Sequence, residues 1–539
     1  MNIKYLTGIT LVATLGGFLF GFDTAVVNGA EKSLVDLFIT KALDSSSYEY
    51  ARSLIIQYRL LVTVVFLIIY FVISGQLIRL FGLKRGIISG IVLLIPLLIF
   101  IIRYLNEQVP SQEETGAIRD ITDSVKGFVV SSALVGCIIG AAISGFIARS
   151  FGRKKGLIIT AFFLTISAIG AWQPERLNFF GTLDVYSFII YRITGGIGIG
   201  LASILSPMYI AEISPAQIRG KLVSWNQFAI ISGMVIIYFI NYLIARSGNE
   251  EWLVKDGWRW MFFSGVIPSL MFLILLFFIP ETPRFLMMKN RKSEALKTIV
   301  RISGPENAIH IQSEIESTLH EKNTPWLSFG LKVILIGIFL SVFQQFVGIN
   351  VVMYYAANIF RNMGASTDAS LLQTIIVGII NMLFTILAIF TVDHFGRKPL
   401  MIAGALIMSI SMLSLGFYFY SGKPGITALI FMLLYIAGFA MSWGPVTWVL
   451  LTEIFPNSIR GATSVPVATL WISNLIVSWT FPILNDNVWL TERFNHGFAY
   501  WIYGIMCLLA LIFVWKFIPE TKGRSLEEIE KFWKKTNSD

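Results

Sequence analysis

The chain has 539 residues, of which 55% are hydrophobic and only 14% charged, with a formal net charge of +10 and a mean hydropathy of +0.72. Soluble domains carry roughly 25% charged residues, so this composition excludes an ordinary soluble protein and indicates one that crosses a membrane many times. The basic residues lie in short loops between apolar runs, a cytoplasmic-loop pattern that does not indicate nucleic-acid binding. Cys137 and Cys507 lie inside apolar runs and predict neither a disulfide nor a metal site.

Fourteen apolar runs have about the 20 residues that a helix needs to cross the hydrocarbon core. An even number of spans places both termini on one side, and the basic segments 149–155, 281–328 and 394–399 predict that this side is the cytoplasm. The acidic stretch 107–123 then faces outside. The runs lie at 6–27, 54–78, 86–104, 127–148, 156–172, 186–209, 223–245, 258–279, 329–360, 371–392, 400–420, 425–451, 463–484 and 498–518.

Three motifs recur in the same order about 240 residues later, which indicates two homologous halves. Parallel repeats of six spans are a known plan of transporters. The motif pairs are SFGRKK (150–155) with HFGRKP (394–399), AEISPAQIRG (211–220) with TEIFPNSIRG (452–461), and PETPR (280–284) with PETKG (519–523).

The runs 54–78 and 86–104 have no counterpart in the second half. SGQLIRLFGLKRGIIS (74–89) resembles SGFIARSFGRKKGLII (144–159), which indicates a local duplication of a span–basic loop–span hairpin. Such an insertion leaves the orientation of every later span unchanged. We expect the hairpin, at about 50–106, to pack on the bundle periphery outside the substrate path; the alternative is a re-entrant or interfacial hairpin.

The predicted fold is therefore an all-α polytopic membrane protein made of two six-helix bundles and an extra N-terminal transmembrane hairpin. The predicted divisions are an N-terminal bundle containing the hairpin (1–280), a cytoplasmic linker (281–328), a C-terminal bundle (329–520) and a cytoplasmic tail (521–539).

Two charged residues lie within apolar runs. Asp23 belongs to the run 6–27, and Arg192 to the run 186–209. A charged side chain in mid-membrane costs about 2.5–3.5 kcal/mol on insertion scales, and such residues usually face a water path, pair with each other or relay protons. The sequence predicts that Asp23 carries a proton and that Arg192 pairs with its charged form. The alternative is a structural ion pair that joins two spans.

Neutral hydrogen-bonding and aromatic residues also occur inside the apolar runs. Amides suit the hydroxyl groups of a sugar, and flat aromatic rings suit its CH faces. In SVFQQFVGINVVMYYA, Asn350 and Tyr354 share a helix face, and Gly348 lets the helix bend. Each such residue alone could equally make a helix–helix contact. The set comprises Gln227, Gln344, Gln345, Asn350, Tyr354, Tyr355, Asn381, Trp448 and Trp471.

Together, the repeated motifs, PMYIAEISPAQIRG and QQFVGIN resemble the sugar porters of the major facilitator superfamily, particularly bacterial xylose–proton symporters. The resemblance covers roughly 6–45 and 125–535. It implies alternating access, with Asp23 and Arg192 as the proton-coupling pair. It also implies sugar contacts from Gln227, Gln344, Gln345, Asn350, Asn381, Trp448 and Trp471, with Phe20 and Tyr354 lining the cavity.

A second set of charges lies at the predicted cytoplasmic ends of the spans. Arginine and glutamate there can pair bidentately, and we expect them to pair across the two bundles. The resemblance implies that such pairs latch the outward-facing state. The alternative is that the basic residues only set the topology, and both roles are compatible. The residues are Arg153, Glu212 and Arg219, mirrored by Arg397, Glu453 and Arg460.

Three positions depart from the symporters. Gly265 stands where they often carry an acidic residue, and Met234 and Leu470 stand where xylose symporters carry glutamines. At position 265 any help that an acidic side chain would give to proton release is therefore absent. The other two remove possible hydroxyl contacts, so the substrate could be a pentose or a hexose, xylose-like or glucose-like.

The sequence contains no nucleophile–base or metal-ligand set, so we expect no enzyme activity, no metal and no cofactor beyond the proton as coupling ion. The predicted function is proton-coupled monosaccharide symport by a monomer in the lipid bilayer of the cell membrane, with no nucleic-acid partner. The alternatives are a facilitative sugar uniporter and a transporter-like sugar sensor, which usually has a longer tail. A drug or cation antiporter fits poorly with a neutral, amide-rich cavity.

Overall fold

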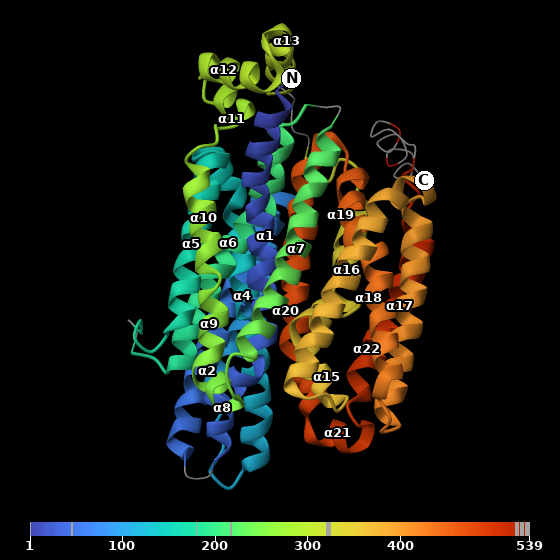
Figure 1. Cartoon of the computed structure of the whole chain (residues 1–539). Helices are drawn as coiled ribbons and strands as arrows, with labels where there is room; N and C mark the ends of the chain where they lie inside the picture. Colours follow the sequence, from blue (N-terminus) through green and yellow to red (C-terminus); the bar gives the residue numbers. More distant parts are fainter. Residues whose placement is uncertain are drawn as a thin grey trace.

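The computed structural model describes residues 2–44, 47–178, 181–215, 218–319, 325–522, 528 and 533, and within them every regular element is a helix. Fourteen helical segments in this part of the chain are long and apolar enough to cross a membrane. They coincide with the fourteen predicted runs, and the all-α prediction is confirmed. Figure 1 shows two bundles standing side by side, the first in blue to green and the second in yellow to red.

Each bundle is built from six of these spans. The first contains α1 (Ile3–Leu34), α4 (Thr115–Ser150), α5 (Arg153–Trp172), α6 (Asp184–Ile213), α7 (Arg219–Ala245) and one span made of α8 (Glu250–Trp252), α9 (Trp258–Phe263) and α10 (Val266–Leu276). The second contains α14 (Leu331–Phe346) with α15 (Ile349–Asn362), α16 (Thr367–Phe395), α17 (Arg397–Tyr420), α18 (Gly425–Met441) with α19 (Trp443–Ile454), α20 (Ser464–Asp486), α21 (Val488–Phe494) as a short connection, and α22 (Gly497–Phe517).

Glycines allow helices of the first bundle to approach closely. A Cβ atom at Gly21 of α1 would lie 1.8 Å from the Ile230 carbonyl oxygen of α7, and one at Gly196 of α6 would lie 1.8 Å from the Ala133 carbonyl oxygen of α4. No side chain fits at such distances, so these positions require glycine. Close backbone contact at small residues is a common way for membrane helices to associate.

The bend predicted at Gly348 is confirmed. Its φ is +95°, a left-handed conformation that favours glycine, and it separates α14 from α15. An added Cβ atom would also lie 2.8 Å from the Tyr503 ring. The bend directs the amides of α14 and those of α15 toward one region.

The inserted hairpin consists of α2 (Tyr48–Phe81) and α3 (Leu83–Asn106), joined at Gly82. Both helices count among the fourteen spans, which supports a spanning hairpin over a re-entrant one. Most apolar side chains of α3 are exposed, as lipid-facing side chains would be. The other helix, α2, contacts α4 of the first bundle and also α20 of the second.

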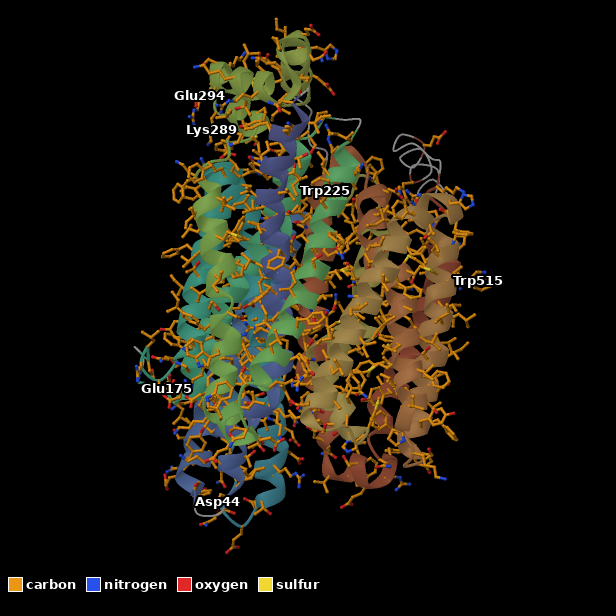
Figure 2. All side chains as sticks on the ribbon, in the orientation of Figure 1. Asp44, Glu175, Trp225, Lys289, Glu294 and Trp515 are labelled. Atoms are coloured by element: carbon orange, nitrogen blue, oxygen red, sulfur yellow. The ribbon has the colours of Figure 1, made fainter. Side chains whose placement is uncertain are left out.

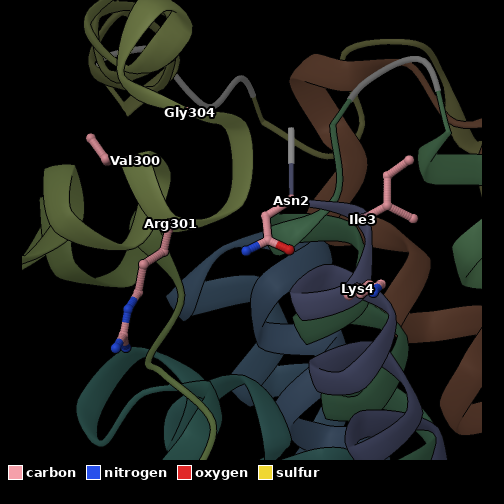
Figure 3. Close-up of a pocket in the computed structure, with 6 residues that line it drawn as sticks. All are labelled: Asn2, Ile3, Lys4, Val300, Arg301 and Gly304. Atoms are coloured by element: carbon pink, nitrogen blue, oxygen red, sulfur yellow. The ribbon is translucent and has the colours of Figure 1, made fainter.

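The segment between the bundles forms three short helices, α11 (Pro283–Met288), α12 (Lys292–Ser303) and α13 (Pro305–Leu319), above the first bundle in Figure 1. We call this side the linker end and the opposite side the far end. The backbone amide of Asn2 donates to the Ile302 carbonyl oxygen at 2.9 Å, which holds the N-terminus against α12. A cavity of about 650 Å³ lies between them, lined by Asn2, Ile3, Lys4, Val300, Arg301 and Gly304 (Figure 3).

Charged side chains lie toward the two ends of the molecule. In Figure 2, Lys289 and Glu294 lie at the linker end and Asp44 near the far end. Trp515 of α22 points outward toward the linker end, with 66% of its surface exposed. Polar ends with tryptophan near one of them suit a protein that crosses a bilayer. The predicted tail, 521–539, falls mostly outside the described residues.

Candidate functional site

The predicted pair of buried charges forms in the structure. An Arg192 guanidinium nitrogen of α6 lies 2.7 Å from the Asp23 Oδ1 of α1, and a second nitrogen donates to the Asp23 backbone carbonyl at 3.1 Å. The Arg192 side chain is 1% exposed and that of Asp23 is 17% exposed. The guanidinium also lies 5.2 Å from the centre of the Phe262 ring. Arg192 of α6 therefore contacts α1 through the charge of Asp23 and α9 through the Phe262 ring.

A small cavity lies beside this pair. About 10 Å³ of it is open to the centre of a water molecule, and its lining includes Asp23, Gly265 and Ser269. This volume is near the minimum for one water molecule. The Asp23 Oδ2 is buried and accepts no hydrogen bond from the described residues. Gly265, the departure from the symporters, thus leaves space next to the carboxylate.

The candidate sugar-binding amides form a continuous chain around the bend. The Gln345 amide donates to the Gln344 carbonyl oxygen, and the Asn350 amide donates to the Gln345 carbonyl oxygen. Gln344 and Gln345 are buried, and Asn350 is partly buried. The structure thus places three of the predicted amides together on α14 and α15.

Aromatic residues lie on helices of both bundles. The rings of Phe20 on α1 and Trp471 on α20 have centroids 5.6 Å apart, so this contact crosses between the bundles. The Trp471 indole nitrogen is buried and has no hydrogen-bond partner among the described residues. A buried indole donor usually has a partner, and a sugar hydroxyl would suit it.

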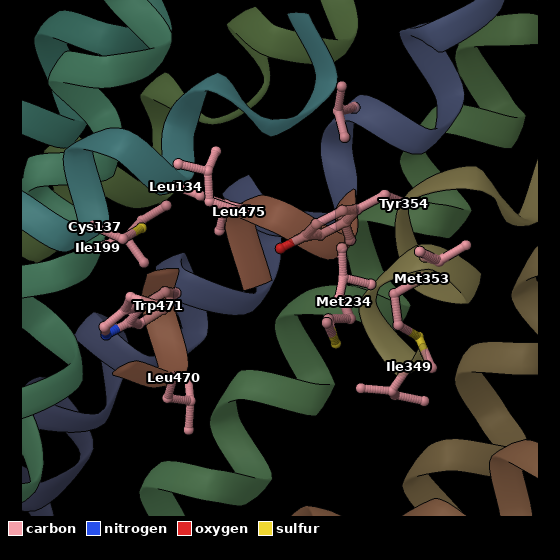
Figure 4. Packing of buried hydrophobic residues seen from close by; sticks show 14 of the residues in the cluster. Leu134, Cys137, Ile199, Met234, Ile349, Met353, Tyr354, Leu470, Trp471 and Leu475 are labelled. Atoms are coloured by element: carbon pink, nitrogen blue, oxygen red, sulfur yellow. The ribbon is translucent and has the colours of Figure 1, made fainter. Parts of the chain in front are cut away.

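The two apolar departures lie in the same region. Figure 4 shows Met234 of α7 and Leu470 of α20 near Tyr354 of α15 and Trp471. All four are buried. Apolar side chains therefore stand beside the aromatic part of the candidate sugar site, where amides would offer hydroxyl contacts.

The other predicted sugar contacts lie on separate helices. Gln227 is on α7, Asn381 on α16 and Trp448 on α19, and each is buried or partly buried. Among the described residues, none of the three shares a hydrogen bond with the amide chain. Within the same part of the chain, no group of three or more His, Cys, Asp or Glu side chains is placed to hold a metal ion.

Replacing Gln345 by Ala should weaken sugar binding about fivefold, since it removes the middle of the amide chain and a net hydrogen bond contributes about 1 kcal/mol. Isothermal titration with the transported sugar would measure this. Gln312→Ala, on α13 at the linker end, is the matched control and should bind normally. Equal affinities for the two variants would show that the amide chain does not contact sugar.

At the linker end, the first-half charges form a cluster that also includes the PETPR motif. Arg153 Nη2 lies 2.7 Å from Glu212 Oε1, which joins α5 to α6. The Thr282 hydroxyl donates to Glu212 Oε2 at 2.7 Å. Glu281 accepts from the backbone amides of Arg153 and Lys154 at 3.1 and 3.2 Å, so its carboxylate caps the start of α5.

The second half repeats the arrangement with its own residues. Arg397 Nη2 lies 2.9 Å from Glu453 Oε1, and the Thr521 hydroxyl donates to Glu453 Oε2 at 2.6 Å. Glu520 accepts from the backbone amides of Arg397 and Lys398 at 3.1 and 3.0 Å. In this structure each arginine therefore pairs with the glutamate of its own half. Pairing across the two bundles, which the resemblance implies for the outward-facing state, stays a prediction. Each glutamate lies close to the arginine of its own half because the two residues stand at adjacent helix ends. The arginine begins one helix (α5 or α17), and the glutamate lies in the last turn of a neighbouring one (α6 or α19).

The remaining two predicted gating residues are Arg219 and Arg460. Arg219 opens α7 and is exposed. The side chain of Arg460 lies outside the described residues. The roles of Glu281 and Glu520 were not predicted, although PETPR and PETKG were recognised as repeats. The sequence signal for this contact was the glycine that precedes the arginine in each GRK motif, Gly152 and Gly396. In the structure a Cβ atom at these positions would lie 2.3 and 2.9 Å from the carboxylates of Glu281 and Glu520.

Glu281 lies outside the membrane spans, and burial raises its pKa above the usual value, although three backbone amides oppose the shift. A raised pKa means that the stabilising contribution is present at low pH and lost as pH rises through the folded-state pKa. Relative to Glu281→Gln, the wild type should therefore gain thermal stability from about pH 7 to about pH 5. Melting curves across this range test it; a stability difference that is flat or reversed contradicts it.

A further cluster of charges lies at the far end and was not predicted. We call Glu31, Lys126, Arg361 and Asp486 the far-end charge cluster. Arg361 Nη2 lies 2.7 Å from Glu31 Oε2, and Lys126 Nζ lies 3.8 Å from Glu31 Oε1 and also pairs with Asp486. Glu31 is on α1 and Lys126 on α4, whereas Arg361 is on α15 and Asp486 on α20.

This cluster joins the two bundles twice. Glu31 is 3% exposed, so its charge depends on these partners. Other polar contacts between the bundles gather nearby: the Thr367 hydroxyl donates to Glu250 at 2.8 Å, and the Asn487 amide donates to Asp120 at 3.2 Å. The far end of the molecule is therefore closed by contacts between the bundles. Each cluster member stands at the end of an apolar run, which is the signal that the sequence offered.

Comparison with known proteins agrees with this architecture. A family described as "Sugar (and other) transporter" matches residues 9–533. The D-xylose-proton symporter of Escherichia coli (strain K12) is 48% identical over 546 residues, covering 99% of this chain and 96% of that protein. The glucose facilitated diffusion protein of Zymomonas mobilis is 41% identical over 417 residues, covering 76% of this chain and 88% of that protein.

Solved structures give the same result. The partially occluded inward open conformation of the xylose transporter XylE from E. coli superimposes with a TM-score of 0.76 at 45% identity, covering 97% of this chain and 100% of that one. The fold and nearly the whole length agree with such a transporter. This chain belongs to the sugar transporter family.

Proposed function

We propose that this protein carries a monosaccharide across the cell membrane together with a proton, by alternating access. The observation that carries the proposal is the buried pair of Asp23 and Arg192, which joins α1 to α6 beside a cavity with room for one water molecule. A buried carboxylate that a water molecule can reach is suited to take up and release a proton.

Protonation of Asp23 would couple to movement through Arg192. A neutral Asp23 no longer attracts the guanidinium, so the bond between α1 and α6 weakens when the proton binds. The two protonation states therefore favour different arrangements of the first bundle. A ligand or proton shifts a conformational equilibrium only through such a difference in interaction.

The sugar would bind between the bundles, where the amide chain of α14 and α15 supplies hydroxyl contacts and Trp471 supplies a flat ring. Met234 and Leu470 make part of this region apolar. A hexose has an extra CH₂ group to place against an apolar wall, so the proposal includes glucose-like as well as xylose-like substrates.

The moving bodies would be residues 1–280 and 329–520, joined by 281–328. Basic residues at the linker end favour a cytoplasmic location for that end and for both termini, with 521–539 as a cytoplasmic tail. The far end is then extracellular. Because the far end is closed, the structure would represent an inward-facing state of a monomer in the cell membrane.

The second candidate is a facilitative uniporter. It is favoured by Gly265, which lacks the acidic group that symporters often carry, and by the similarity to a glucose facilitated diffusion protein. In that case the Asp23–Arg192 pair would only hold α1 to α6. A sugar sensor has no structural observation in its favour.

Sugar-induced proton uptake into proteoliposomes, over a panel of pentoses and hexoses, tests the proposal. We expect external alkalinisation with at least one sugar of the panel. Sugar exchange without any proton signal would instead make the protein a uniporter. The absence of exchange for every sugar would overturn monosaccharide transport itself.

A further inference from the structure

The inserted hairpin reaches the contact between the two bundles through Tyr58 of α2. The Tyr58 hydroxyl lies 2.6 Å from the Ser124 hydroxyl of α4, and the Trp479 indole of α20 donates to it at 3.0 Å. The same indole donates to the Ser124 carbonyl oxygen at 3.1 Å. Tyr58 is 2% exposed. One hydroxyl of the hairpin thus bonds to a residue of each bundle.

Tyr58 lies beside a close approach of α4 and α20. A Cβ atom at Gly127 would lie 2.0 Å from the Trp479 carbonyl oxygen, so the two backbones touch there. The Trp479 and Phe128 ring centroids are 4.9 Å apart, and the Tyr58 ring lies 6.1 Å from Phe128 and 6.4 Å from Trp479. These edge-on rings form a cluster that spans the bundle interface.

The ring cluster adjoins the far-end charge cluster. Lys126, the neighbour of Gly127, pairs with Asp486, which lies about two turns after Trp479 on α20. The ring cluster and the far-end charge cluster therefore lie on the same interface between the two bundles.

The hairpin is held to the first bundle at this level. The Tyr186 hydroxyl of α6 donates to the Leu54 carbonyl oxygen, and the Leu183 amide donates to the Gln57 side chain at 3.1 Å. Tyr58 lies within one turn of both residues. It therefore moves with the first bundle, and the Trp479–Tyr58 bond has to break when the far end opens.

We propose that Tyr58 makes the inserted hairpin part of the extracellular gate, as a positioning residue that stabilises the closed far end. The inference rests on the proposed alternating access. It assigns a role to a segment that has no counterpart in the second half, and it differs from a hairpin that only faces lipid.

The test compares Tyr58→Phe with Tyr70→Phe. The first keeps the ring and removes the hydroxyl that bridges the bundles, whereas Tyr70 donates to the Gly90 carbonyl oxygen within the hairpin at 3.3 Å. Spin labels go on introduced cysteines at Arg119 and Glu492, which are exposed at the far end of the two bundles. The native Cys137 and Cys507 are buried and stay unlabelled.

In nanodiscs without sugar, Tyr58→Phe should raise the ratio of long to short label distances about two- to tenfold, the effect of one lost hydrogen bond. Tyr70→Phe should match the wild type. Identical distributions for the wild type and Tyr58→Phe would overturn the proposal, as would an equal shift in both variants. If Tyr58→Phe fails to fold, Trp479→Phe decides, because it removes the donor from the other bundle. It should shift the distances in the same direction and by at least as much, since the bond to the Ser124 carbonyl oxygen is lost as well.

This readout uses neither sugar nor a proton gradient, so its outcome is separate from that of the transport assay. A protein that moves no sugar but shows the shift retains the gate and loses the proposed function. A protein that transports sugar but shows no shift supports the proposed function and overturns the gating role of Tyr58.

Discussion

Asp23→Asn should abolish uphill sugar accumulation while sugar exchange continues. The amide has nearly the shape of the carboxylic acid but cannot gain or lose a proton. It therefore resembles the protonated state permanently, in which Arg192 is released from its charged partner. The carrier can then still cycle with sugar bound, but no proton movement drives it.

The expected loss is large. A membrane potential of 100 mV supplies about 2.3 kcal/mol per charge, which supports roughly 40-fold accumulation at about 1.4 kcal/mol per tenfold. In Asp23→Asn the ratio should fall to about one. The measurement is the internal-to-external ratio of labelled sugar in energised vesicles, with counterflow measured in parallel.

The matched control is Asp36→Asn. Asp36 follows α1 in the same span, but it is exposed and lies more than three turns beyond Asp23 toward the far end. It should accumulate sugar as the wild type does. If Asp23→Asn also accumulates sugar uphill, another group carries the proton and the ion pair is structural.

The sequence predicted the Asp23–Arg192 pair because the physics leaves few alternatives. An isolated charge in mid-membrane is costly, so two opposite charges in separate apolar runs are expected to meet. The fourteen spans were predictable for a similar reason, since hydrocarbon thickness sets their length. The repeats then placed the spans in two bundles.

Partner choice was less predictable. The two halves carry the same motifs, so the sequence alone does not tell whether Arg153 meets Glu212 of its own half or Glu453 of the other. The structure shows the first arrangement. A second conformation of the same chain could change these contacts, and one sequence encodes both.

The partners within the far-end charge cluster and the position of Tyr58 were not predictable from local patterns. Glu31 and Arg361 are 330 residues apart in sequence, and nothing in either run indicates the other. Likewise, the run 54–78 shows no periodicity that would direct Tyr58 toward Trp479. Such contacts depend on how the helices pack, which composition and repeats do not specify.

Arg361→Met should shift the protein toward a form that is open at the far end. The variant removes the closest cation from Glu31, which is almost fully buried. Among the described residues, Glu31 then keeps Lys126 at 3.8 Å and the Asn358 amide at 3.3 Å. Breaking a buried ion pair costs 3–5 kcal/mol. We expect about 2 kcal/mol here because Lys126 remains, which is roughly a 30-fold shift.

The cost falls on the closed form, since an open far end would return Glu31 to water. The label pair at Arg119 and Glu492 measures the shift as a growth of the long-distance population. Arg361→Lys keeps the cation and should stay near the wild type. The double variant Glu31→Gln with Arg361→Met leaves no unpaired carboxylate and should recover much of the closure. Unchanged distances in Arg361→Met would show that this ion pair does not hold the bundles together.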